Sequence, residues 1–205
     1  MKQQSRNQQK NAGNVNGSAE SSNGSSGQPS LLEKFFTDQL KDIYYAEQLL
    51  LKALPELQKA STTEELEQAF ANHTKQTERH VKRLEKVFKM LNKNPEGKKC
   101  EAMEGLVKEA RTVISETKEG TMTRDVGLII AAQKVEHYEI ASYGGLVQLA
   151  ITMGLDQAAG LLDKTLNEEE ETDYLLTEIA ESNVNVEAED EGQYSWEKKE
   201  QEEEA

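Results

Sequence analysis

The stretch AAQKVEHYEIASYG, residues 131–144, places two glutamates inside an otherwise apolar helical stripe. Its apolar residues recur at steps of three and four, the period of one face of an α-helix, and Glu136 and Glu139 fall on that face. An unpaired carboxylate is costly to bury, so a core that holds several of them must either protonate them or supply a cation. The stretch therefore makes a buried metal site the first hypothesis for this chain.

Three other segments carry polar side chains within an apolar stripe in the same way. Gly and Pro are confined to a few positions, and no stretch of any length has the alternating pattern of a β-strand, so an all-α fold is predicted. Residues 131–144 belong to a helix expected over 122–153. The other polar positions are Glu47 in a helix over 31–59; His73, Thr77 and His80 in a helix over 64–91; and Glu169 and Asp173 in a helix over 156–182.

The order of these segments predicts a ferritin-like four-helix bundle. The helices over 31–59 and 64–91 form one antiparallel hairpin, and those over 122–153 and 156–182 form a second. A shorter helix over 101–117 is expected to cross between them. Bundles with this connectivity take metal ligands from facing helices at mid-height.

The depth of the polar residues agrees with such a site. Glu47 lies about fourteen residues before the turn of the first hairpin, and His73 lies about twelve after it. Glu139 and Glu169 lie about sixteen and fourteen residues from the turn of the second hairpin. All four side chains are therefore expected near the middle of their helices, at one level of the bundle.

Composition limits the partners and the compartment. The chain has 205 residues, one cysteine and a formal net charge of -14, which argues against nucleic acid or an anionic membrane as a partner. No apolar run is long enough to span a membrane, and the N-terminus lacks the apolar segment of a secretory signal, so a soluble protein of the reducing cytoplasm is expected. Residues 1–30 form a polar N-terminal tail expected to be disordered, residues 31–186 the bundle, and residues 187–205 an acidic C-terminal tail.

Four segments resemble the YciE/YciF family of stress-associated ferritin-like proteins: KDIYYAEQLL at 41–50, AFANHTKQT at 69–77, CEAMEGLVKEA at 100–110, and the stretch at 131–144. The resemblance covers residues 31–186 and implies a fold similar to those of rubrerythrins and ferritins, with a role in bacterial stress responses. It does not imply a defined reaction. Carried over position by position, it supports the following acids as metal ligands: Glu47, Glu136, Glu139, Glu169 and Asp173.

The chain departs from the usual di-iron pattern on the second helix. No Glu-x-x-His motif occurs, and this helix offers His73 and Thr77, with Gln76, where relatives can have an acid. The missing carboxylate argues against a symmetric di-iron pair and leaves room for a single ion, a different metal or none, beside a dinuclear iron or manganese centre of another kind.

Each candidate also has a structural interpretation. His73 is a ligand or a hydrogen-bonded packing residue. Glu136 can turn outward at the edge of its stripe, and Asp173 can pair with a cation of the crossover helix. The remaining alternatives are a hydrogen bond to Tyr44 or a neighbouring helix for Glu47, a structural role for His80, an exposed position for His137, and either packing or hydrogen-bond donation for Tyr143.

The sequence thus favours an iron- or manganese-binding protein of stress protection, in which carboxylates leave positions for peroxide or oxygen, as a peroxidase or oxidase requires. The competing hypothesis is a non-enzymatic helical scaffold without metal. A homodimer is expected because apolar residues lie off the main stripe of the first helix, at Tyr45, Leu49 and Leu51.

Overall fold

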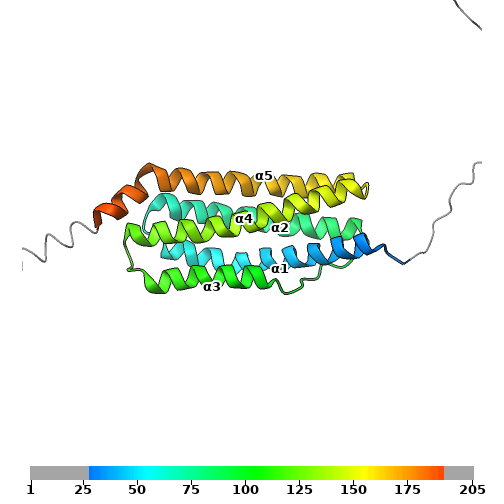
Figure 1. Cartoon of the computed structure of the whole chain (residues 1–205), viewed down its shortest axis with the longest axis horizontal. Helices are drawn as coiled ribbons and strands as arrows, with labels where there is room; N and C mark the ends of the chain where they lie inside the picture. Colours follow the sequence, from blue (N-terminus) through cyan, green and yellow to red (C-terminus); the bar gives the residue numbers. More distant parts are fainter. Residues whose placement is uncertain (1–27, 192–205) are drawn as a thin grey trace, which may run out of the picture.

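The structure, a computed structural model, describes residues 28–191 and contains no β-strand among them. Five α-helices lie nearly parallel to the long axis of the molecule (Figure 1). This confirms the predicted all-α, ferritin-like fold. In chain order the elements are α1 (Leu31–Ala60), α2 (Glu64–Met90), α3 (Glu101–Glu116), α4 (Met122–Thr152), α5 (Asp156–Ile179) and a π-helical turn, η1 (Ala180–Val184).

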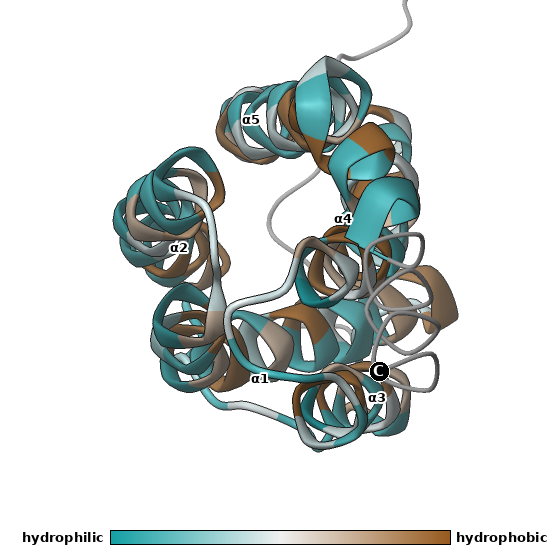
Figure 2. Cartoon of the chain, turned by 90° about the vertical axis from the view of Figure 1, so that its left-hand side faces the viewer, coloured by the Kyte–Doolittle hydropathy of each residue, from teal (hydrophilic) through white to brown (hydrophobic). Residues whose placement is uncertain are grey.

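The two predicted hairpins form the bundle, and α3 packs on the outside of it. Figure 2, viewed end-on, shows α1, α2, α4 and α5 around a common centre, with α3 beside α1 and α4. Tyr45 of α1 donates a hydrogen bond to Glu104 of α3, and Leu49 packs against the core. Two of the three residues expected to support a homodimer are thus engaged within the chain.

The ends of the helices follow from local sequence, with one contribution from a distant residue. Ser30 and Glu33 form a capping box at the start of α1, and Gly154 adopts a φ of 70° after the end of α4. At the start of α2, Thr63 is the N-cap, and the carboxylate that binds this turn comes from α4. Buried Asp125 accepts hydrogen bonds from the backbone N–H groups of Thr62 and Thr63, at 2.7 and 2.8 Å, and from the Thr63 hydroxyl.

The folded part extends beyond the expected boundary at residue 186. After η1 the chain remains helical to Glu191, the last described residue. The Glu191 carboxylate accepts from the backbone N–H groups of Met122 at 2.6 Å and Thr123 at 3.1 Å, where the dipole of α4 favours a negative charge. Glu191 therefore caps α4, whereas the expectations for residues 1–27 and 192–205 lie outside the described residues.

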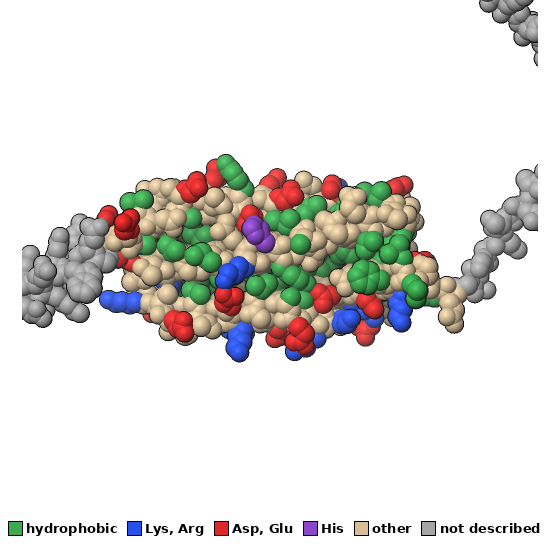
Figure 3. Space-filling model, in the orientation of Figure 1, with side chains coloured by type: hydrophobic (Ala, Val, Ile, Leu, Met, Phe, Trp, Pro, Cys, Tyr) green, Lys and Arg blue, Asp and Glu red, His purple; other side chains and the backbone are tan. Residues whose placement is uncertain are grey.

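The core is apolar at both ends of the bundle and polar in the middle. Phe36, Leu40 and Phe88 are buried towards one end, and Leu66 and Leu128 towards the other. On the face shown in Figure 3, acidic, basic and apolar side chains are interspersed. No helix in the described part of the chain is both long enough and apolar enough to cross a membrane.

Candidate metal centre

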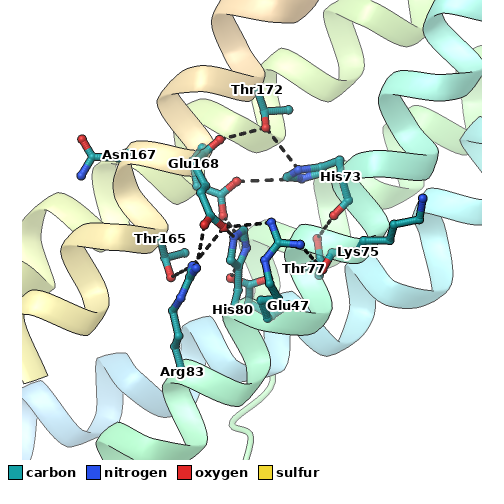
Figure 4. Close-up of polar contacts among 12 residues, drawn as sticks. Glu47, His73, Lys75, Thr77, His80, Arg83, Thr165, Asn167, Glu168 and Thr172 are labelled. Atoms are coloured by element: carbon teal, nitrogen blue, oxygen red, sulfur yellow. Dashed lines mark hydrogen bonds and ion pairs between the residues drawn. The ribbon is translucent and has the colours of Figure 1, made fainter.

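Six titratable side chains from the four bundle helices meet in the polar middle layer. Each is at most 2 % exposed, although carboxylates and imidazoles are rarely buried without a partner. Figure 4 shows part of this layer from the side of α2 and α5. The six are Glu47 of α1, His73 and His80 of α2, Glu136 and Glu139 of α4, and Glu169 of α5.

The first group of potential ligands lies between α2, α4 and α5. One atom each of His73, Glu136, Glu139 and Glu169 lies within 4.8 Å of the corresponding atoms of the other three. The Nε2 atom of His73 is 3.4 Å from Oε1 of Glu136 and 3.9 Å from Oε2 of Glu169. Three carboxylates and one imidazole thus surround one point.

The second group shares a residue with the first. Glu47, His80 and Glu169 also offer atoms within 4.8 Å of one another. The Nδ1 atom of His80 is 2.9 Å from Oε1 of Glu169 and 3.4 Å from Oε1 of Glu47. Glu169 therefore belongs to both groups and would be a ligand shared between them.

Several buried side-chain atoms of the layer lack hydrogen-bond partners. Most buried polar groups in proteins are paired, so a cluster of unpaired ones requires an explanation. Four carboxylates carry the charge that two divalent cations balance, and oxygen donors with two imidazoles suit iron or manganese. The residues therefore fit a dinuclear centre. The atoms without a partner are Glu47 Oε2, His73 Nε2, Glu136 Oε2, Glu169 Oε2 and both carboxylate oxygens of Glu139, whereas His80 Nδ1 and Glu169 Oε1 lie 2.9 Å apart.

Burial and mutual repulsion control the protonation of the layer. Burial raises the pKa of Glu136 and Glu139 well above the usual range, and the nearby charge of Glu169 raises both further. Burial lowers the pKa of His73. For His80 burial acts in the same direction, but the carboxylates of Glu47 and Glu169 outweigh it and raise the pKa to about 11. Without metal, the imidazolium of His80 is the cation that faces these carboxylates.

Two hydroxyl groups complete the layer. Tyr143 is fully buried and donates a hydrogen bond to Oε1 of Glu47, so it both packs in the core and acts as a donor, the two alternatives that the sequence left open. Thr77 is also buried, but its hydroxyl donates back to the carbonyl of His73 at 3.0 Å. Thr77 of α2 therefore adds no carboxylate to the centre, and its hydroxyl proton is bound within its own helix.

The structure brings together five of the six predicted ligands and leaves Asp173 outside both groups. Four residues after Glu169, the helix has turned about 40° past a full turn. Asp173 accordingly points towards the rim, where its Oδ2 atom is 3.1 Å from Nε2 of exposed His137. The suggested pairing of Asp173 with a cation of the crossover helix is wrong, because its partner lies on α4.

His80 is the residue that the sequence interpretation missed. The sequence predicts a structural role for His80, because this residue lies two helical turns beyond His73. Seven residues correspond to a rise of about 10.5 Å along a helix, yet the two imidazole centroids are only 6.3 Å apart, because the side chains converge. The available signal was the seven-residue spacing, which keeps both rings on one face of the helix.

Comparisons with known proteins agree with this fold. The profile of a family described as a domain of unknown function, DUF892, matches residues 31–189. Protein YciF of Escherichia coli strain K12 is 46% identical over 159 residues, which are 77% of this chain and 95% of that protein. The crystal structure of the E. coli stress protein YciF matches with a TM-score of 0.72 and covers 77% of this chain and 99% of that one.

Two further solved structures are similar. YcfI from Rhodopseudomonas palustris, described as a candidate structural protein, is 38% identical with a TM-score of 0.70, over 72% of this chain and 94% of that one. A protein from Xanthomonas campestris is 23% identical with a TM-score of 0.62, over 78% of this chain and 97% of that one, and supports the fold alone.

Proposed function

The chain belongs to the DUF892 family and is a relative of YciF, as its motifs predicted, and on that premise we propose that it is a ferritin-like metal-binding protein of bacterial stress protection. The observation that carries the proposal is the pair of buried ligand groups that share Glu169. One ion would be held by His73, Glu136, Glu139 and Glu169, and the other by Glu47, His80 and Glu169.

Bound iron or manganese would supply one-electron redox chemistry towards peroxide or oxygen. The chain supplies the surroundings for that chemistry. The apolar layers on either side of the centre exclude bulk water, Tyr143 holds the orientation of Glu47, and Glu169 would contribute a ligand atom to both positions. A peroxidase or oxidase activity is the reaction class that this arrangement favours.

Metal titration of single variants tests the proposal. The wild type should take up two equivalents of Mn²⁺ or Fe²⁺ per chain under anaerobic conditions. Glu47→Gln should remove the position beside His80, and Glu139→Gln the position beside His73, so that each variant keeps one equivalent. The exposed Glu170→Gln serves as the matched control. Two full equivalents in both site variants would refute the assignment.

A non-enzymatic scaffold is the second candidate function. It is favoured by the imidazolium of His80, which faces Glu47 and Glu169 and offsets part of their charge without metal. The description of YcfI as a candidate structural protein points the same way. Protein purified without chelator from metal-replete cells decides between the two, because a scaffold should contain far less than one ion per chain and show no peroxide consumption.

A further inference from the structure

The outward-facing nitrogens of both histidines contact side chains of α5 that do not belong to either ligand group. Glu168 contacts His80 and Thr172 contacts His73, and these two residues lie one helical turn apart on either side of Glu169. Figure 4 shows both contacts at the outer edge of the layer.

The carboxylate of Glu168 is clamped by Arg83 of α2. Nη2 of Arg83 donates to Oε1 of Glu168 at 2.6 Å, and Nη1 donates to Oε2 at 3.0 Å. Nη1 also donates to the hydroxyl of Thr165 at 3.2 Å, which fixes the guanidinium from a third direction. A two-point contact of this kind is rigid and holds the carboxylate in one plane.

The clamp determines which nitrogen of His80 faces the centre. Nε2 of His80 is 2.8 Å from Oε2 of Glu168. Both oxygens of Glu168 accept hydrogen bonds from the guanidinium of Arg83, and a carboxylate paired in this way is an acceptor towards His80 as well. Nε2 must therefore carry a proton, and Nδ1 is the nitrogen left to face Glu47 and Glu169.

The corresponding contact of His73 is weaker. The hydroxyl of Thr172 donates to the carbonyl of Glu168 at 2.9 Å, so towards Nδ1 of His73, 3.4 Å away, it can only accept. This contact favours a proton on Nδ1 and leaves Nε2 to face Glu136. It is uncharged and long, whereas the contact of His80 is short and charge-assisted.

We propose that Glu168, clamped by Arg83, is the positioning residue of the centre: it fixes the ring of His80 with Nδ1 turned inward, while Thr172 orients His73 more loosely. The inference rests on the proposed function, since it concerns the same centre. Loss of an acceptor that holds a metal-ligating histidine typically weakens metal binding by about 10- to 100-fold. Metal affinity should fall at the position formed by Glu47, His80 and Glu169 and stay unchanged at the other position.

The experiment compares Glu168→Ala and Glu168→Gln with Glu170→Ala, which also removes one negative charge but lies on the exposed face of α5. Mn²⁺ titration by calorimetry should show one of two sites weakened by about 10- to 100-fold in Glu168→Ala. Glu168→Gln should lose less Mn²⁺ affinity, because its amide oxygen still accepts a hydrogen bond from Nε2 of His80. Glu170→Ala should match the wild type.

A metal-free measurement separates failure of this inference from failure of the proposed function. In ¹⁵N-labelled metal-free protein, the Nε2–H proton of His80 should give a slowly exchanging resonance that disappears in Glu168→Ala and persists in Glu170→Ala. If the wild type binds no Mn²⁺ but this pattern holds, the proposed function fails and the positioning by Glu168 stands. If the resonance is unaffected by Glu168→Ala, or if both Glu168 variants lose thermal stability with unchanged Mn²⁺ affinity, the positioning role is refuted.

Discussion

At the residue scale, the metal-free centre holds more negative charge than it can pair. The imidazolium of His80 balances one carboxylate, while burial and repulsion keep protons on Glu136 and Glu139. A carboxyl whose pKa is raised by folding binds more protons in the native than in the unfolded state, so it lowers stability as pH rises. The buried acids therefore make the metal-free fold sensitive to pH.

The direction of this sensitivity follows from the shifts. Stability contributed by His80 is complete below its unfolded pKa of about 6.5 and is lost as pH rises towards about 11. Glu136 and Glu139 act in the same direction, because their native pKa values lie above the unfolded value of 4.5. Glu168 acts oppositely, and its contribution is lost as pH falls from 4.5 towards about 2. The melting temperature of the metal-free protein should therefore be highest near pH 5.

Replacing two of the acids should remove much of this dependence. Glu136→Gln/Glu139→Gln mimics protonation, so the metal-free variant should be more stable than wild type at pH 7 and should lose less stability than wild type between pH 5 and pH 7. Urea unfolding at pH 5 and pH 7 measures the effect, with Glu170→Gln as control. Equal stability of wild type and variant at both pH values would contradict it.

Part of the centre was predictable residue by residue. Position along each helix was enough to align Glu47, His73, Glu139 and Glu169, because rise per residue is constant. The position of a residue around the helix axis did not show that His80 contacts Glu169 or that Asp173 points to the rim. These orientations depend on the direction of each side chain and on how the helices pack against one another.

At the element scale, helix starts depend on carboxylates from distant segments. Asp125 of α4 binds the start of α2, and Glu191 binds the start of α4. Gly, Pro and capping residues predicted where the helices begin and end, since these signals are local. The two carboxylates could not be assigned in this way, because their partners lie 62 and 69 residues away in sequence.

The two caps should differ in strength because they differ in exposure. Asp125 is fully buried and accepts three hydrogen bonds, whereas Glu191 is partly exposed. Asp125→Ala should cost about 2 kcal/mol or more, since it leaves buried donors unpaired, and Glu191→Ala about 0.5 to 1 kcal/mol. Chemical denaturation of both variants measures this, and a larger loss for Glu191→Ala would contradict the ranking.

At the scale of the whole molecule, metal should stabilise the fold because ligands come from all four bundle helices. Free metal at a hundred to a thousand times its dissociation constant stabilises by roughly 3 to 4 kcal/mol. Calorimetric melting of wild type with Mn²⁺ and with chelator measures the shift, and Glu136→Gln/Glu139→Gln should show much less of it. An identical melting temperature with and without metal would favour the scaffold.

The expected homodimer can use apolar side chains that α3 leaves uncovered. Phe35 and Ile151 are 54% and 52% exposed, and both lie towards the end of the bundle that holds the start of α1 and the end of α4. Phe35→Glu/Ile151→Glu should convert a dimer to a monomer in light scattering. Val186→Glu, which changes an exposed apolar residue at the opposite end, should leave the mass unchanged. A monomeric wild type at micromolar concentration would overturn the expectation.

The sharing of ligands between the two hairpins has a consequence for the rate at which the protein unfolds. One ligand group combines Glu47 and His80 of the first hairpin with Glu169 of the second. The other combines His73 of the first hairpin with Glu169 and two further glutamates of the second. Neither hairpin alone can assemble a complete group, so the ligands converge only after the hairpins dock. An interaction that forms after the transition state slows unfolding and leaves the folding rate unchanged. Bound metal should therefore lengthen the lifetime of the native state, and stopped-flow refolding should proceed equally fast with and without it.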